Sequence, residues 1–305
     1  MTTKDLWIAI DWGTSNFRAF LMSTDGSVLD KISASQGLLA VTSGEFPTVL
    51  HQLLAPWHHC GDSLPLLLGG MVGSQQGWRE APYVSVPASV ASLSEKLVLV
   101  ELGNGQSGWI VPGFSAINQA GLPDVMRGEE LQLLGLAALA PTPRLRAILP
   151  GTHSKHAVLC GDVVQSFNTF MTGELFSLLK HHSILGRQLP VQQPCQTSFL
   201  KGVDASLEGG LSQVLFSVRT LRLFEQIPIQ AVESYLSGLL IGSELAALKG
   251  AGTPLFVVGD EGLCQWYLLA MEWLGVHAEF ISGDRCFLVG MTQIYQQLKE
   301  SRHVS

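Results

Sequence analysis

The residues best suited to chemistry stand near the start of the chain, where an apolar segment ends in an acid and a polar turn follows. Residues 7–10 are apolar, Asp11 ends them, and Arg18 comes shortly after. The turn between these two charged residues contains Gly13, Thr14 and Ser15. Mg²⁺ prefers one or two carboxylates together with phosphate oxygens, glycine lets the backbone approach a ligand, and a guanidinium binds anionic oxygen. We therefore predict a phosphate and metal site on a β-hairpin, with Asp11 holding the metal.

A second turn of similar character follows another apolar segment near the middle of the chain. Its residues are Gly151, Thr152, His153, Ser154 and Lys155. A glycine, hydroxyl groups and a lysine together suit an anionic oxygen ligand. His153 could donate a hydrogen bond to a phosphate, but a single histidine in a loop is also compatible with a solvated or structural role.

A third glycine-bearing turn follows the apolar segment 253–258. It contains Gly259, Asp260 and Gly262, and an amphipathic helix to residue 274 comes next. Glycines at the end of a strand let the backbone lie against a nucleotide, and the N-terminus of a helix favours negative charge. The alternative is that Asp260 only caps that helix.

A polar, glycine-rich loop at residues 69–80 offers groups for a hydroxylated acid. Its candidate contacts are Gln75, Gln76 and Arg79. Sugar hydroxyls need amide or carboxylate partners, and an acid substrate needs a cation. Arg127 is a second candidate for the acid group, and Asn168 is a further candidate for the sugar. A surface loop without a binding role would also be polar and rich in glycine.

The composition is that of a well-buried globular protein. The chain has 305 residues, of which 47% are hydrophobic and 14% charged, with a mean hydropathy of +0.29. This length suggests about two domains. No apolar run approaches the roughly 20 residues that span a bilayer, and the polar start before the first strand does not fit a signal peptide. A net charge of -7 disfavours nucleic acid, and five scattered cysteines indicate a reduced, cytoplasmic protein without a disulfide or zinc pattern.

The expected secondary structure repeats one plan of three consecutive strands. The first set lies within residues 7–33, with a turn at Asp25-Gly26, and the second set begins at Ala147. We therefore predict a duplicated architecture with an N-terminal lobe at 1–145 and a C-terminal lobe at 146–305. The other elements expected in the first lobe are a helix at 47–57, a buried strand at 64–68, a strand-and-loop segment at 107–118 with Gly113 in the turn, and a helix at 129–140. In the second lobe we expect strands at 147–150, 156–160 and 163–168 and a helix at 234–248. In that last helix Gly238 and Gly242 share a packing face.

The segment Asp-Trp-Gly-Thr-Ser-Asn-Phe-Arg-Ala at residues 11–19 resembles the first phosphate motif of the actin-like ATPase superfamily, which includes sugar kinases. The turns at 151–155 and 259–262 resemble its second phosphate motif and its adenosine motif, although the second motif often carries an Asp that this chain lacks. The resemblance implies an α/β, two-lobed actin-like ATPase (ribonuclease H-like) fold. Each lobe is then a mixed sheet flanked by helices.

Two acids begin the helix that resembles the connection between the lobes in this superfamily. Its relatives place a Glu there that handles the attacking water, which makes Glu130, or else Glu129, a candidate general base. The alternative is that both are first-turn acids favoured by the helix dipole.

Three longer strings, at residues 124–130, 149–156 and 170–179, closely resemble the 2-dehydro-3-deoxygalactonokinase family. This resemblance implies phosphorylation of 2-dehydro-3-deoxy-D-galactonate at O6 in galactonate catabolism, with ATP and Mg²⁺ bound between the lobes and Arg18 neutralising the developing charge. The partners implied are the sugar acid and ATP, with no nucleic acid and no membrane, and a homodimer stays open. Two alternatives remain: a kinase for another sugar or sugar acid, and a non-catalytic actin-like ATP-binding protein.

Overall fold

The chain divides into two compact units that are discontinuous in sequence. The computed structural model describes residues 6–42, 44–60, 64–103, 105–118, 120–248 and 253–303. Unit 1 comprises Met1–Arg144, Ala157–Asn168 and Gly283–Ser305, and unit 2 comprises Leu145–His156 and Thr169–Ser282. The lobe boundary predicted after residue 145 rests on the repeated order of strands. The two compact units do not test it, and it stays a prediction.

A six-stranded mixed sheet forms the centre of unit 1, with the strand order β3-β2-β1-β4-β7-β6. Its strands are β1 (Leu6–Trp12), β2 (Phe17–Ser23), β3 (Val28–Ala34), β4 (Leu66–Gly69), β6 (Val98–Glu101) and β7 (Ser107–Ile110). The central strand β4 is buried throughout and fully apolar, as expected for a strand covered on both faces. Asp11 pairs with Arg18 on the antiparallel strand β2 and with Gly69 on the parallel strand β4. The ends of three strands therefore meet at Asp11.

A five-stranded sheet repeats the same connectivity, with the order β12-β11-β10-β13-β14. Its strands are β10 (Leu145–Leu149), β11 (Ser154–Cys160), β12 (Val163–Phe170), β13 (Leu255–Gly259) and β14 (Glu279–Ser282). In both sheets a run of three consecutive strands is followed by a parallel neighbour of the first strand, β4 beside β1 and β13 beside β10. The predicted duplicated architecture is thus confirmed by strand order and direction.

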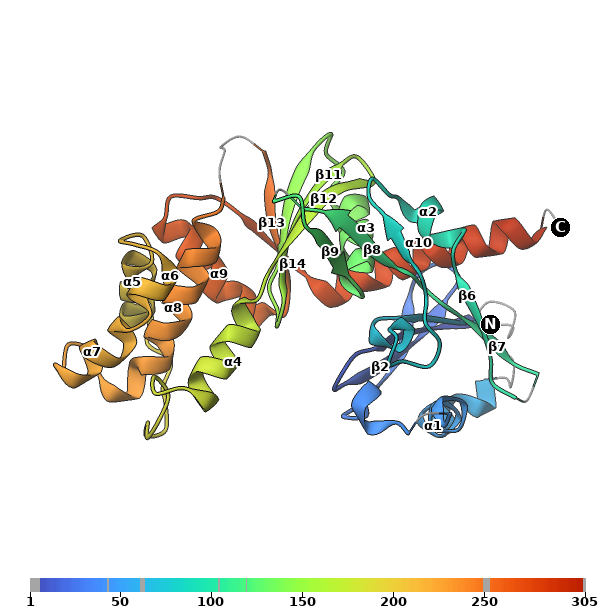
Figure 1. Ribbon diagram of the computed structural model, residues 1–305. Coiled ribbons are helices and arrows are strands. Elements are labelled where there is room, and N and C mark those ends of the chain that lie inside the picture. Colours follow the sequence, from blue (N-terminus) through green and yellow to red (C-terminus); the bar gives the residue numbers. More distant parts are fainter. Residues whose placement is uncertain are drawn as a thin grey trace. The chain divides into compact units, whose positions relative to one another are not determined.

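The described part of unit 1 also contains four α-helices and a small sheet. They are α1 (Phe46–Leu53), α2 (Val90–Ser94), α3 (Glu129–Leu139) and α10 (Gly283–His303), with a sheet of β5 (Tyr83–Ser85), β8 (Gly113–Ile117) and β9 (Pro123–Met126) in the order β5-β8-β9. Figure 1 shows α10 running beside α3. The contact needs glycine on both helices, because a Cβ added at Gly135 would lie 1.8 Å from the Cys286 oxygen and one at Gly290 would lie 2.1 Å from the Leu131 oxygen.

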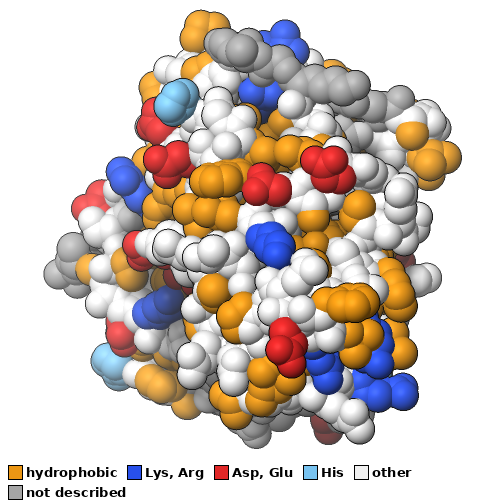
Figure 2. All heavy atoms as spheres, turned by 90° about the vertical axis from the view of Figure 1, so that its left-hand side faces the viewer, with side chains coloured by type: hydrophobic (Ala, Val, Ile, Leu, Met, Phe, Trp, Pro, Cys, Tyr) orange, Lys and Arg blue, Asp and Glu red, His pale blue; other side chains and the backbone are white. Residues whose placement is uncertain are grey.

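Unit 2 carries a group of helices packed around α8. They are α4 (Thr172–His182), α5 (Gln196–Ala205), α6 (Leu211–Val214), α7 (Ser217–Leu223), α8 (Val232–Leu245) and α9 (Glu261–Trp273). A Cβ added at Gly238 would lie 1.9 Å from the Phe199 oxygen, and one at Gly242 would lie 2.4 Å from Ser206 Oγ. The predicted packing face of these two glycines is confirmed, and α5 is the helix that uses it. Figure 2 shows one face of the molecule, on which hydrophobic side chains lie among charged and polar ones.

Prolines account for two differences from the predicted boundaries. The helix predicted at 47–57 ends at Leu53 and continues as a 3₁₀-helix at Ala55–Cys60, because Pro56 has no N–H and its ring opposes a continuous α-helix. The strand predicted at 64–68 begins at Leu66, after Pro65, whose carbonyl still accepts a bond of 2.9 Å from the Ile8 N–H.

One further expectation differs from the structure, and one long helix was not predicted. Gly113, predicted in a turn, instead begins strand β8, where a Cβ would lie 2.3 Å from the Met126 oxygen of the neighbouring strand. The long helix α10 was not predicted, and its amphipathic pattern is interrupted by the packing glycine Gly290. Among the described residues, no helix combines the length and the apolar character that a membrane span requires.

We predict that Gly238→Ala destabilises the protein, although alanine is the better helix former by about 1 kcal/mol. The added methyl forces α5 and α8 apart, and overpacking of this kind typically costs about 1–3 kcal/mol. The control is Gly210→Ala, because no atom lies within 4 Å of a Cβ added at Gly210. Thermal unfolding of both variants checks the prediction, and equal melting temperatures would contradict it.

Candidate functional site

Asp11 and Arg18 form an ion pair across the first hairpin. Arg18 Nε donates to Asp11 Oδ2 at 3.1 Å, and the guanidinium also contacts Asp284 at the start of α10. Lys31 Nζ lies 3.2 Å from Asp284 Oδ2. Burial lowers the pKa of Arg18, but the charges of Asp11 and Asp284 outweigh this effect and raise it. Two carboxylates and two cations thus alternate at this end of the hairpin.

In the turn after Asp11 the Gly13 N–H donates to the Asn16 oxygen at 2.9 Å, and the carbonyl oxygens are also engaged. The carbonyls of Gly13, Thr14 and Ser15 accept N–H bonds of 2.9, 3.2 and 3.1 Å from residues 38, 39 and 37. The side chains of Thr14 and Ser15 are exposed. Thr14 and Ser15 can therefore present hydroxyl groups, which are donors that suit an anion.

Gly70 connects Asp11 with the start of α3. Its backbone has a φ of 89°, and a Cβ there would lie 3.1 Å from Asp11 Oδ1 and 2.9 Å from the Trp12 oxygen. A Cβ added at Gly128, the N-cap of α3, would lie 3.5 Å from the Gly70 Cα. The N–H of Gly128 in turn donates to Glu130 Oε2 at 2.6 Å. The structure therefore brings together two predicted site residues, Asp11 and Glu130, with only glycine backbone as the intermediary.

The two acids at the start of α3 have different environments. Glu130 is fully buried, its Oε1 has no hydrogen-bond partner, and burial, reinforced by the charge of Glu129, raises its pKa to about 8. Glu129 is only partly buried and accepts the Arg127 N–H at 3.1 Å. A pKa near neutrality lets Glu130 exchange a proton under physiological conditions, which is what general acid–base chemistry needs.

Arg127 lies against the glycine-rich loop with part of its guanidinium unused. Its Nη2 donates to the Ala81 oxygen at 2.8 Å, and its Cζ lies 4.4 Å from the centre of the Tyr83 ring. Nε and Nη1 are buried without a hydrogen-bond partner, and so is Ser74 Oγ in the adjoining loop. A buried guanidinium with two unused donors can bind a carboxylate.

The other predicted sugar contacts lie in more ordinary surroundings. Arg79 is exposed, and its Nη1 donates to the Leu99 oxygen at 2.8 Å. Gln75 and Gln76 are exposed, and Asn168 is partly buried in β12. The two arginines thus differ in environment, because of the two only Arg127 has buried guanidinium donors without a hydrogen-bond partner.

In unit 2 the second and third predicted turns lie side by side. Strands β10 and β13 are parallel, so the turns that follow them leave the same edge of the sheet. A Cβ added at Gly259 would lie 3.8 Å from the Pro150 oxygen. Asp260 is the N-cap of α9 and accepts the Leu263 N–H at 3.2 Å, so it has the capping role that was the alternative to nucleotide binding. Gly262 is exposed in the first turn of that helix.

In the turn after β10, the Cα of Gly151 faces open space, whereas its carbonyl oxygen is packed against the start of α4. No atom lies within 4 Å of a Cβ added at Gly151, whereas Gly173, at the start of α4, would place a Cβ 2.4 Å from the Gly151 oxygen. Thr152 and His153 are exposed, and His153 Nε2 lies 2.5 Å from Glu174 Oε2. The open space at Gly151 is where a ligand can approach the backbone.

The last two residues of the predicted turn point away from solvent. Ser154 is fully buried and its Oγ donates to Glu244 Oε1 at 2.6 Å. Lys155 is 4% exposed and lies in strand β11. The accessible part of the turn is therefore Gly151 to His153.

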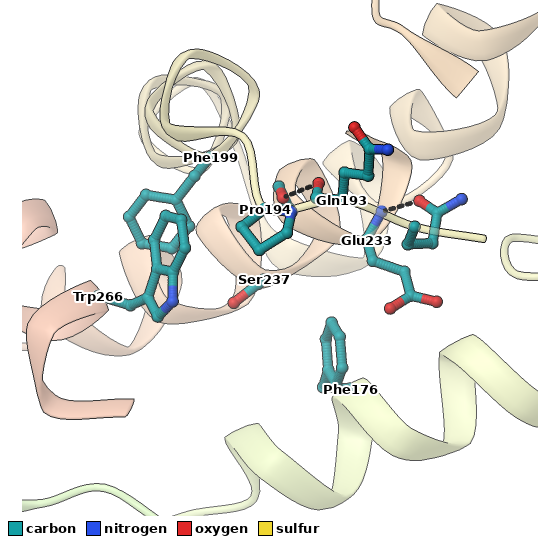
Figure 3. Close-up of a pocket in the computed structure, with 9 residues that line it drawn as sticks. Phe176, Gln193, Pro194, Phe199, Glu233, Ser237 and Trp266 are labelled. Atoms are coloured by element: carbon teal, nitrogen blue, oxygen red, sulfur yellow. Dashed lines mark hydrogen bonds between the residues drawn. The ribbon is translucent and has the colours of Figure 1, made fainter. Parts of the chain in front are cut away.

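A cavity of about 270 Å³ lies among the helices of unit 2 (Figure 3). Phe176 of α4, Phe199 of α5 and Trp266 of α9 give it aromatic walls, and Glu233 of α8 and Gln193 add polar groups. Gly173 near the start of α4 packs on the Gly151 oxygen, and α9 begins at Glu261, directly after the third turn, so two of the helices that border the cavity also border the turns.

Two residues that hold these groups in place were not identified from the sequence. Asp284 pairs with Arg18, and Glu244 accepts hydrogen bonds in the middle of unit 2. Each lies far along the chain from its partners, so local spacing carries no signal for either. An acid within an apolar helix, as Glu244 is in α8, is the one feature that could have singled it out, since buried carboxylates need partners.

Glu130 gives a prediction for stability against pH. Its pKa is about 8 in the folded protein and near 4.3 in an unfolded chain, so unfolding releases a proton between these values and stability falls as the pH rises from about 4.5 to 8. Glu130→Gln removes this loss. The melting temperature of the variant, relative to the wild type, should therefore rise between pH 5 and pH 8. The exposed Glu272→Gln is the control, and a pH-independent difference for Glu130→Gln would contradict the prediction.

Comparisons with known proteins identify relatives that match nearly the whole chain. A family profile for 2-keto-3-deoxy-galactonokinase matches residues 11–294. The chain is 35% identical over 292 residues to a 2-dehydro-3-deoxygalactonokinase of Escherichia coli (strain K12), with 94% of this chain and 97% of that protein covered. A crystal structure from Sinorhizobium meliloti that carries the same description has a TM-score of 0.88 at 32% identity, covering 96% of this chain and 99% of that one.

A more distant structure shares the fold alone. It is the activator of the 2-hydroxyisocaproyl-CoA dehydratase from Clostridium difficile with bound ADPNP, with a TM-score of 0.52, 12% identity and 98% coverage of both chains. The expected two-lobed actin-like ATPase fold, with a mixed sheet flanked by helices in each lobe, is confirmed. The family match spans nearly all of the described strands and helices, and the bacterial relative aligns over almost its whole length. As the motifs predicted, the chain belongs to the 2-keto-3-deoxy-galactonokinase family.

Proposed function

We propose that the protein transfers a phosphoryl group from ATP to O6 of 2-dehydro-3-deoxy-D-galactonate, giving 2-dehydro-3-deoxy-6-phospho-D-galactonate and ADP in galactonate catabolism. The family and the names of its relatives support this substrate. The observation that carries the proposal is the buried Glu130 carboxyl with a pKa near 8, held beside Asp11 by glycine backbone. Five free cysteines fit a cytoplasmic enzyme.

Phosphoryl transfer depends mainly on positioning and charge neutralisation. The turn at Gly13–Ser15 in unit 1 and the turn at Gly151–His153 in unit 2 each offer donors that suit phosphate oxygens. Arg18 offers its guanidinium to the charge that develops on the transferring group. The nucleoside lies along Gly259–Gly262, and the aromatic walls of the neighbouring cavity suit a flat purine ring.

The site fits a magnesium ion that is held mostly by phosphate. Asp11 Oδ2 accepts from Arg18, while Oδ1 faces Gly70, so one carboxylate oxygen is oriented away from the ion pair. No group of three or more His, Cys, Asp or Glu side chains that could hold a metal occurs in the described ranges. A single carboxylate with phosphate oxygens is a donor set that Mg²⁺ accepts. When bound, the ion supplies neutralisation of phosphate charge.

The sugar acid is held and deprotonated by residues of unit 1. The unused donors of Arg127 bind its carboxylate, with Ser74 nearby in the loop. Gln75, Gln76 and Asn168 remain the candidates for its hydroxyl groups. Glu130 accepts the proton of the O6 hydroxyl, and its burial prevents water from competing for that proton.

Glu130→Gln should lower kcat for the sugar acid by about 10²–10⁴, because a positioned general base contributes that much. Glu129→Gln is the matched control and should change kcat only a few-fold, since Glu129 binds a backbone N–H at the helix start. A coupled assay for ADP release measures both. Absence of ADP release by the wild type with 2-dehydro-3-deoxygalactonate would overturn the proposed function, and full turnover by both variants would overturn the assignment of the base.

Arg127→Lys should raise the KM for the sugar acid by about tenfold or more while the KM for ATP stays within a factor of two. Lysine cannot reproduce the two parallel hydrogen bonds that a guanidinium makes to a carboxylate. Arg79→Lys is the control, because Arg79 already binds the Leu99 carbonyl. Equal effects of the two substitutions on the sugar-acid KM would place the carboxylate elsewhere.

A further inference from the structure

Glu244 is a buried acid in the apolar helix α8 of unit 2. Its side chain is 1% exposed, and its two oxygens accept four hydrogen bonds from three other elements. Placing a carboxyl group in a protein interior costs free energy unless its lone pairs are satisfied, and four donors satisfy them. A site with this many matched partners holds its neighbours in one arrangement.

The two oxygens of Glu244 serve different elements. Oε1 lies 2.6 Å from Ser154 Oγ and 2.8 Å from His156 Nε2, both at the start of β11. Oε2 accepts from Thr172 Oγ1, the first residue of α4, and from the Tyr267 hydroxyl of α9 at 2.7 Å. Burial raises the pKa of the Tyr267 phenol, and the charge of Glu244 adds to this, so the phenol stays a donor.

These partners flank the groups that bind phosphate in the proposed function. Ser154 follows the open turn Gly151–His153 directly. Thr172 precedes Gly173, which packs on the Gly151 oxygen, and the Glu174 N–H donates to the Thr152 oxygen at 2.9 Å. Both sides of the turn are therefore tied to one carboxyl group, and α9, which begins at the third turn, is tied to the same group.

We propose that Glu244 is a positioning residue that fixes the phosphate-binding turn Gly151–His153 against α4 and α9. Its role is indirect, because both of its oxygens are occupied by protein donors, and this inference rests on the proposed role of that turn in binding ATP. A displacement of about 1 Å in a positioning group can cost on the order of 10²-fold in rate. Loss of the Glu244 bonds should therefore weaken ATP binding specifically.

The test compares Glu244→Gln with the wild type. The amide keeps the volume of the side chain but faces two of the four donors with an NH₂ group, so two hydrogen bonds are lost. We expect the KM for ATP to rise at least tenfold and the affinity for a non-hydrolysable ATP analogue, measured by calorimetry, to fall by a similar factor, while the KM for the sugar acid stays within a factor of two. Glu272→Gln on the exposed face of α9 is the control and should change none of these values.

A second variant covers the case in which Glu244→Gln does not fold. Thr172→Val removes only the bond to α4 and keeps the shape of the side chain, and it should raise the KM for ATP several-fold. Unchanged ATP affinity in a folded Glu244→Gln or Thr172→Val protein would overturn the inference. A lower melting temperature with both KM values unaltered would do the same, because it would show a purely structural role.

Gly151→Ala separates failure of the inference from failure of the proposed function. The added methyl enters open space, so the fold tolerates it, but it occupies the place where phosphate would approach the backbone. If Gly151→Ala weakens binding of the ATP analogue and Glu244→Gln does not, the positioning role is wrong and the turn's role stands. If neither weakens it, the turn does not bind phosphate, and both fail.

Discussion

The candidate chemistry of unit 1 depends on the close approach of Asp11 to the backbone of Gly70. A strand end, a loop and a helix start meet there, and no side chain larger than hydrogen fits, because a Cβ on Gly70 would lie 2.9 Å from the Trp12 oxygen. The positive φ of Gly70 adds a second reason for glycine, since other residues adopt it only under strain. This contact lets the buried carboxyl of Glu130 lie near the charged carboxylate of Asp11. A larger residue would separate the acid of the hairpin from the acid of the helix.

Unit 2 achieves the same kind of arrangement by other means. The five-stranded sheet repeats the strand order of the first, and the turns of unit 2 likewise leave the ends of parallel strands. The turn after β10 is held by hydrogen bonds from Ser154 and Thr172 to Glu244. A duplicated fold therefore supports two turns whose supporting contacts differ, one set by glycine packing and one by a buried acid.

The sequence predicted the parts of this protein that local pattern determines. The hairpin with Asp11 and Arg18, the repeated strands and the acids at the start of α3 are encoded by residues close together in the chain. Near prolines the observed boundaries of α1 and β4 differ from the predicted ones. Proline lacks an N–H, and local sequence does not show which carbonyl would have accepted a hydrogen bond from that N–H. Arg79 and Arg127 could not be ranked, since the difference between them is the burial of one guanidinium. The roles of Asp284 and Glu244 could not be predicted from local sequence patterns, because their partners are distant in sequence.

The pairing of Arg18 with Asp284 has a consequence for how the protein is made. These two residues are 266 positions apart, and α10, which begins at Gly283, also packs on α3 through Gly135 and Gly290. Ribosomes add about 5–20 residues per second, so roughly 13–50 s separate the synthesis of the hairpin from that of its partner. During that interval the first sheet is present without the helix that covers it and pairs its arginine. Unit 1 is thus completed last, although its strands are made first, and the nascent chain must keep an apolar sheet surface from aggregating until α10 emerges.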